Sequence, residues 1–174
     1  ALSIKPFFTL SKNECATTRQ TKVTFRTMRH RYIVEQLTGT TFGAVIKDIK
    51  LEGLSAETWS EIEALLYEHG VLIFPSQHLS AETQASVALY FGELDGSHSD
   101  HSDRARSISN WIDDETVLTD RDPTWLTLTY PTRYWHMDGT FNPIPPKICL
   151  LGAMSISAGG GQTGFADMCA AYDA

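Results

Sequence analysis

The chain has 174 residues, of which 42% are hydrophobic, 10% aromatic and 20% charged, and its formal net charge is −7. This length suits one domain, because single domains usually hold roughly 100 to 200 residues, and the composition excludes a disordered or fibrous chain. No apolar run approaches the roughly 20 residues that a membrane-spanning helix needs, so we expect a soluble protein with no membrane partner.

Charge is distributed unevenly along the chain. Residues 1–31 hold seven of the 14 Lys and Arg residues and one acidic residue, whereas residues 32–174 hold seven basic against 20 acidic residues. Phosphate binding needs a basic face, so the acidic part argues against nucleic acid as a partner. The basic start, residues 1–30, is predicted to be a disordered or targeting segment, and residues 31–174 are predicted to fold.

Cysteine usage bears on the compartment. The three cysteines include no Cys-x-x-Cys pair and are odd in number, which does not indicate a disulfide framework. A cytoplasmic location is therefore expected, with mitochondrial import of a chain whose basic start is a transit segment as the alternative.

The first predicted elements are two short strands within residues 31–51, separated by a glycine-containing turn. A helix is predicted over residues 53–70, because Ser55 can cap its first turn and Gly70 stands where the left-handed residue after a helix belongs. The short apolar run 71–74 then predicts a buried strand that ends at a proline.

A second helix is predicted to begin after Ser80 and to stop at Gly92. Residues 92–104 are polar and rich in turn formers, which predicts a loop. Residues 105–112 allow a strand, and residues 113–124 form a polar excursion of the kind that often covers a binding site.

From residue 134 to residue 168, the pattern predicts strands, interrupted by a proline-rich stretch and by a glycine turn at residues 158–161. Two helices early in the chain and strands late in the chain predict an α+β fold.

His136 and Asp138 stand two residues apart in one of these predicted strands. Side chains at such positions point to the same face of a strand, so an imidazole and a carboxylate could bind one ion together. One His, one carboxylate and a distant second His form the facial triad of non-haem iron oxygenases, which implies iron(II). Taken alone, the pattern is weak, because two such residues at a strand end more often bind each other or water.

The sequence around this pair contains further residues in a fixed order: Trp135, His136, Asp138, Phe141, Pro145, Pro146, Gly160, Gly161, Thr163, Phe165, Asp167, Met168, Ala171 and Tyr172. Their order and spacing resemble the family of taurine dioxygenase and dichlorophenoxyacetate dioxygenase. The resemblance extends upstream and covers roughly residues 31–174, with the "SISN" stretch and the final "DMCAAYDA" closer to the dichlorophenoxyacetate branch.

The resemblance implies an iron(II)- and 2-oxoglutarate-dependent dioxygenase. Its fold would be a double-stranded β-helix, or jelly roll, with flanking helices, incomplete in this chain. In the implied reaction, dioxygen and 2-oxoglutarate are consumed, succinate is formed and a C–H bond of a small organic acid or similar anion is hydroxylated. These small molecules are the expected partners, and homo-oligomer formation is left open.

The resemblance also implies residue roles. His136 and Asp138 correspond to the first two iron ligands, and Thr163 to the threonine whose hydroxyl binds the carboxylate of 2-oxoglutarate. The third ligand, a His, and an Arg that binds the cosubstrate are expected past Ala174. We therefore expect these 174 residues alone to be inactive. The alternative to this cosubstrate-binding role is that Thr163 is an ordinary β-branched residue of a strand.

Weaker candidates for the substrate pocket are Trp135, Thr132 and His98. The taurine branch has an amide at the position of Thr132, so taurine is not favoured as the substrate. Without a role in the pocket, Trp135 would be an aromatic residue of the core, and His98 would be a solvated loop residue. At the level of function, a mononuclear zinc hydrolase and a catalytically inactive fragment are the alternatives.

Overall fold

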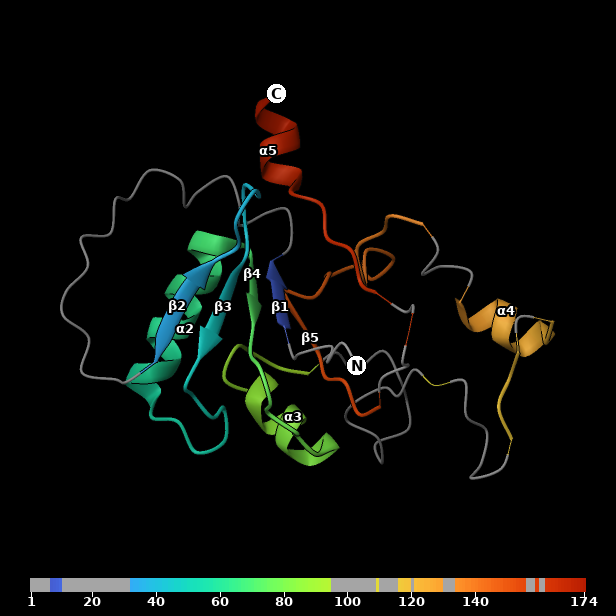
Figure 1. Cartoon of the computed structure of the whole chain (residues 1–174), viewed down its shortest axis with the longest axis horizontal. Helices are drawn as coiled ribbons and strands as arrows, with labels where there is room; N and C mark the ends of the chain where they lie inside the picture. The colour runs from blue at the N-terminus through green and yellow to red at the C-terminus, as the bar shows by residue number, and fades with distance from the viewer. Residues whose placement is uncertain are drawn as a thin grey trace.

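The computed structural model describes residues 7–10, 32–94, 109, 116–119, 121–129, 134–155, 159 and 162–174. In chain order, the helices and strands are β1 (Phe7–Leu10), β2 (Ile33–Gln36), β3 (Ala44–Lys47), α2 (Ala56–His69), β4 (Val71–Ile73), α3 (Ala81–Ala88), α4 (Pro123–Thr129), β5 (Ile148–Leu151) and α5 (Met168–Asp173) (Figure 1).

The strands form one mixed sheet in the order β2-β3-β4-β1-β5. β2 and β3 are an antiparallel hairpin, and β3 and β4 are parallel, with α2 as the crossover between them. β1 lies antiparallel between β4 and β5, so that Thr9 is paired with Val71 on one side and with Cys149 on the other. β1 was not expected from the basic composition of the first 30 residues.

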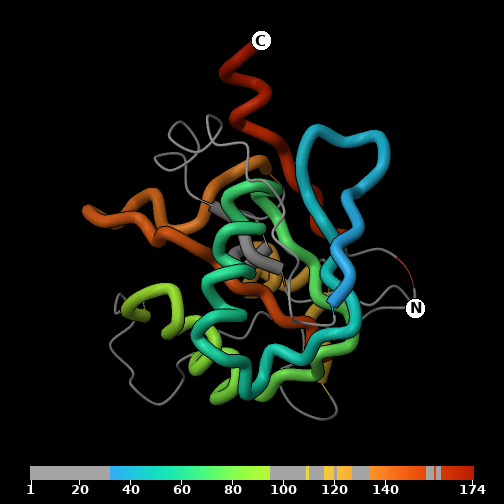
Figure 2. The backbone as a smooth tube through the Cα atoms, turned by 90° about the vertical axis from the view of Figure 1, so that its left-hand side faces the viewer, coloured from blue at the N-terminus to red at the C-terminus, as the bar shows by residue number. Residues whose placement is uncertain are grey.

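Helix α2 confirms its predicted caps. The Ser55 hydroxyl accepts a hydrogen bond from the Thr58 N–H at 3.3 Å, and Gly70, with φ +70°, donates its N–H to the Leu66 carbonyl at 2.7 Å. The helix lies along one face of the sheet (Figures 1 and 2) and buries its apolar side against it. Each large side chain buried in this way contributes roughly 1.5–3 kcal/mol. The core cluster consists of Ala44, Ile46, Leu51, Trp59, Ile62, Leu65, Leu66, Leu72, Phe74, Leu79 and Val87.

The buried Gln77 joins two connections that lead out of the sheet. Its Oε1 accepts the N–H of Leu51, and its Nε2 donates to the carbonyls of Ile49 and Pro75, all at 2.9 Å. The segment after β3 and the segment after β4 are therefore held together by one side chain whose polar atoms are satisfied.

The second helix is present but shorter than predicted, since α3 ends at Ala88 and not at Gly92. Beyond this point the N–H groups of Tyr90 and Phe91 bond three residues back, which tightens and ends the helix. Both rings pack on Trp59, at centroid distances of 4.7 and 5.5 Å. Contacts between distant parts of the chain thus set this helix end.

The prediction of strands from residue 134 onward is largely wrong. Among the described residues of this stretch, only Ile148–Leu151 (β5) form a strand, whereas residues 134–141 and 162–167 are irregular and α5 begins at Met168. The side chain of Asp167 starts α5 by accepting the N–H groups of Cys169 and Ala170, each at 2.9 Å. Neither α5 nor α4 was predicted. The strand allowed at residues 105–112 lies outside the described residues, apart from residue 109, which belongs to no element.

The α+β expectation holds in its coarse form, a small mixed sheet with helices, while the described strands make one sheet and the double-stranded β-helix stays a prediction. Within the described part of the chain, no helix combines the length and hydropathy needed to cross a membrane. Cys169 is disulfide-bonded, which the cysteine count did not predict, whereas Cys149 is not part of a disulfide.

Candidate metal site

The two predicted metal ligands lie in the irregular segment before β5. The expected strand is replaced by a turn over residues 138–141, with φ +66° at Gly139 and a hydrogen bond of 3.0 Å from the Asn142 N–H to the Gly139 carbonyl. A strand needs a partner for its backbone groups, and a left-handed residue interrupts the extended conformation that such pairing requires. Among the described strands, none pairs with this segment.

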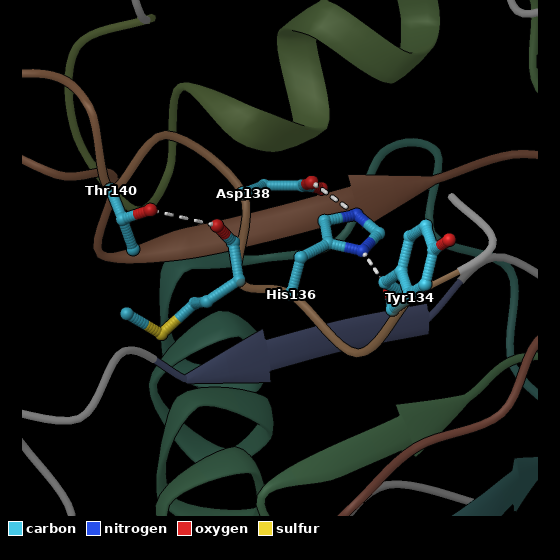
Figure 3. A network of polar contacts seen from close by, with 5 residues as sticks. Tyr134, His136, Asp138 and Thr140 are labelled. Carbon is cyan, nitrogen blue, oxygen red and sulfur yellow. Dashed lines mark hydrogen bonds and ion pairs between the residues drawn. The ribbon is translucent and has the colours of Figure 1, made fainter. Parts of the chain in front are cut away.

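His136 and Asp138 nevertheless lie side by side (Figure 3). His136 Nε2 is 3.3 Å from Asp138 Oδ1, and the exposed fractions of the two side chains are 45% and 67%. Two ligand atoms at right angles around an ion, each about 2.1 Å from it, are about 3 Å apart. The observed separation therefore suits two adjacent positions around one metal ion, on an open surface and not in an enclosed cavity.

The other ring nitrogen of His136 defines the tautomer of the neutral ring. Nδ1 lies 2.8 Å from the carbonyl oxygen of Tyr134. A carbonyl only accepts hydrogen bonds, so Nδ1 carries a proton and Nε2 of the neutral imidazole presents its lone pair. A lone pair facing a carboxylate oxygen favours a cation between them, and a backbone carbonyl behind a ligand His is a common arrangement in metal sites.

The same geometry also fits a simple ion pair in which His136 is doubly protonated. Such an exposed pair contributes little to stability. The described residues contain no group of three or more His, Cys, Asp or Glu side chains that could hold a metal ion. The local residues thus offer two adjacent donor atoms for a metal ion, and a complete site would need further ligands.

Thr163, the predicted cosubstrate-binding residue, is followed in the chain by a glycine that contacts the segment of His136 and Asp138. Thr163 is exposed and belongs to the irregular stretch before α5. A Cβ atom on the following residue, Gly164, would lie 3.2 Å from Cη2 of Trp135. The Thr163 segment therefore passes against the ring that directly precedes His136, although the two segments are far apart in sequence.

Among the weaker pocket candidates, Trp135 is mostly exposed and borders Gly164, so it is not a core residue of the described structure. Thr132 and His98 lie outside the described residues.

A further contact near the Thr163 segment was missed at the sequence level. The Thr41 hydroxyl, in the β2–β3 turn, donates to Asp167 Oδ2 at 2.6 Å. No local pattern relates these two positions, which are 126 residues apart. By contrast, the Asp-Gly pair at residues 138–139 is a turn signal that could have argued against a strand.

A family model and individual relatives of this chain point to the same family of proteins. The sequence model described as "Taurine catabolism dioxygenase TauD, TfdA family" matches residues 33–174. The chain is 36% identical over 135 residues to a protein of Sphingobium herbicidovorans named (S)-phenoxypropionate/alpha-ketoglutarate-dioxygenase, covering 77% of this chain and 45% of the relative. It is 34% identical over 142 residues to a protein of Cupriavidus pinatubonensis named alpha-ketoglutarate-dependent 2,4-dichlorophenoxyacetate dioxygenase, covering 76% and 49%.

Among solved structures, the fold is similar to that of AAD-2 in a crystal structure with Mn(II) and N-oxalylglycine. The TM-score is 0.56 at 26% identity, over 67% of this chain and 39% of the other. The chain thus spans about half the length of the curated relatives it matches.

Proposed function

Because the chain belongs to the taurine catabolism dioxygenase TauD, TfdA family, we propose that it is the N-terminal portion of an iron(II)- and 2-oxoglutarate-dependent dioxygenase. The observation that supports this most is the pair formed by His136 and Asp138, whose ligand atoms are 3.3 Å apart, with the Tyr134 carbonyl behind the imidazole. An imidazole and a carboxylate with further positions left open form the donor set of a facial triad.

In this proposal, His136 offers the Nε2 lone pair and Asp138 a negative charge to iron, while the Thr163 hydroxyl donates a hydrogen bond to a carboxylate oxygen of 2-oxoglutarate. When bound, iron(II) supplies the activation of dioxygen that couples oxidation of 2-oxoglutarate to hydroxylation of the substrate. A third ligand, a His, and an Arg for the cosubstrate would come from chain beyond residue 174.

We propose a small organic anion as the substrate. Two relatives carry the names of phenoxypropionate and dichlorophenoxyacetate, both aryloxy carboxylates. Trp135 directly precedes in the chain the metal pair, His136 and Asp138, and its exposed indole borders Gly164, so it could contact an aromatic ring held there. Aryloxy carboxylates are therefore the first compounds to test.

The first prediction concerns metal binding by the full-length protein. Asp138→Asn removes the anionic ligand with little change in shape, so we expect Mn(II) affinity to fall by at least about tenfold and succinate release from 2-oxoglutarate to be lost. The matched control is Asp48→Asn, in the connection between β3 and α2, where φ is +59° and asparagine is well tolerated. Mn(II) titration and succinate assays of both variants provide the measurement.

Equal Mn(II) affinity of Asp138→Asn and Asp48→Asn would overturn the assignment of the metal pair. Turnover that persists without dioxygen would instead indicate the zinc hydrolase alternative. A full-length protein that binds no metal and releases no succinate would indicate an inactive relative of the family.

A further inference from the structure

The segment that carries the metal pair is almost entirely exposed. From residue 134 to residue 144, Gly139 is the one buried residue, and Phe141 and Ile144 are more than four-fifths exposed. An exposed segment cannot hold two side chains in a fixed relative position unless something fixes its backbone. The burial of Gly139, directly after Asp138, identifies where that happens.

Gly139 is required at its position for two separate reasons. Its φ of +66° lies in the left-handed region, which side chains with a Cβ rarely adopt. A Cβ atom there would also overlap Cδ of Pro146 and lie 2.8 Å from its Cγ. The backbone at Gly139 is thus in direct contact with the proline ring.

The turn around Gly139 is closed by hydrogen bonds on both sides. The Asn142 N–H donates to the Gly139 carbonyl at 3.0 Å, and the Thr140 hydroxyl donates to the Met137 carbonyl at 3.3 Å (Figure 3). These bonds fix the direction in which the chain leaves Asp138, and hence the side to which its carboxylate points.

Pro146, in turn, is joined to the core through the next residue. Lys147 Nζ is 2.9 Å from Glu63 Oε1 and lies 5.3 Å from the ring centroid of Tyr67, both on α2. The Tyr67 hydroxyl donates to the same Glu63 oxygen at 3.3 Å. Hydrogen bonds to Tyr67 and Glu63 raise the pKa of Lys147 above its ordinary value of 10.5.

We propose that Gly139 and Lys147 are positioning residues for the metal pair: the Gly139–Pro146 contact and the Lys147–Glu63 ion pair fix the turn after Asp138 to helix α2 and so hold the Asp138 carboxylate beside His136. Their effect on metal affinity rests on the proposed function, whereas the attachment of the turn to α2 does not.

Gly139→Ala in the full-length protein tests the first contact. We expect Mn(II) affinity to fall on the order of tenfold, which is typical when a group that orients a ligand is altered. The matched control is Gly53→Ala, because Gly53 has nearly the same φ, +72°, but a Cβ there would meet no atom within 4 Å. Both variants carry the same backbone strain, so comparable unfolding midpoints with different Mn(II) affinities would isolate the contact with Pro146.

Lys147→Met tests the second contact without backbone strain. Its control is Lys47→Met, which removes a more exposed ion pair with Glu35 between β2 and β3. We expect Lys147→Met to weaken Mn(II) binding several-fold and Lys47→Met to leave it within twofold of the parent protein.

Amide hydrogen exchange of residues 134–146, measured without metal, separates this inference from the proposed function. Faster exchange of the Asn142 amide in Gly139→Ala and Lys147→Met than in their controls would support the attachment of the turn, even if the parent protein bound no Mn(II). Unchanged exchange relative to the controls would overturn the inference, whatever the metal affinity. Faster exchange with unchanged Mn(II) affinity would overturn the positioning role.

Discussion

At the scale of single residues, Gln77 shows how much can depend on one buried amide. Its three hydrogen bonds satisfy two carbonyls and one N–H on different connections. Because leucine of similar size would leave these groups unpaired, we expect Gln77→Leu to lower the free energy of unfolding by about 3 kcal/mol. Urea unfolding measures this. Gln36→Leu, on the exposed β2, should stay within about 0.5 kcal/mol of the parent, and equal midpoints for the two variants would contradict the prediction.

At the site itself, the residue types could be predicted from the sequence, whereas the backbone conformation and the tertiary contacts could not. The order and spacing of the motif residues from Trp135 to Tyr172, together with the upstream sequence, were enough to predict the family, and the spacing of His136 and Asp138 to predict that they lie side by side. The conformation between the two ligands was predicted wrongly, because a pattern of alternating residues describes a strand only if a neighbour pairs with it. The contact of Gly164 with Trp135 depends on tertiary packing and leaves no local signal.

At the scale of elements, helix α2 is attached to the start of the β2 hairpin by Tyr32, whose hydroxyl donates to Glu61 Oε2 at 3.0 Å. Burial, this hydrogen bond and the charge of Glu61 raise the pKa of Tyr32 above its ordinary value of 10.0. Because the folded-state pKa is raised, the associated stability is complete below about pH 10 and is lost as the pH rises further.

We therefore expect the free energy of unfolding to fall above about pH 10, and to fall less steeply in Tyr32→Phe, which cannot ionise. Urea unfolding at about pH 8 and about pH 11 checks this. Tyr172→Phe serves as the control, since Tyr172 is 90% exposed. The same pH dependence in Tyr32→Phe and in the parent protein would be inconsistent with the prediction.

Elements differ in how well the sequence predicts them. Helix α2 carries its own signals, a serine at one end and a glycine at the other, and was predicted nearly to the residue. Helix α5 has six residues and depends on Asp167, which is also held by Thr41 from the β2–β3 turn. So short a helix is marginal by itself, and no periodic pattern could have identified it.

At the scale of the whole molecule, the buried hydrophobic side chains are confined to one part of the described chain. Among the residues whose burial the structure describes, all buried hydrophobic residues lie between Ala44 and Leu118. In contrast, eight large hydrophobic side chains after residue 133 are exposed: Tyr134, Trp135, Met137, Phe141, Ile144, Met154, Met168 and Tyr172. Exposed apolar surface of this extent favours association.

We accordingly expect the 174-residue chain by itself to bind the dye ANS and to self-associate, and the double variant Phe141→Ser, Ile144→Ser to do both less. Dye fluorescence and sedimentation velocity are the measurements. Ile33→Thr, an exposed position on β2, should change neither property. A monomeric chain that leaves the dye fluorescence unchanged would refute the expectation.

The position of β1 between β4 and β5 has a consequence for how the protein is made. The four residues Phe7–Leu10 are synthesised before their neighbours in the sheet, which follow only at residues 71–73 and 148–151. Such long-range pairing slows folding, because a large loop must close before contacts form. Completion of the sheet therefore has to wait until translation has passed β5, and a tag fused directly before Phe7 would be carried beside the C-terminal ends of β4 and β5.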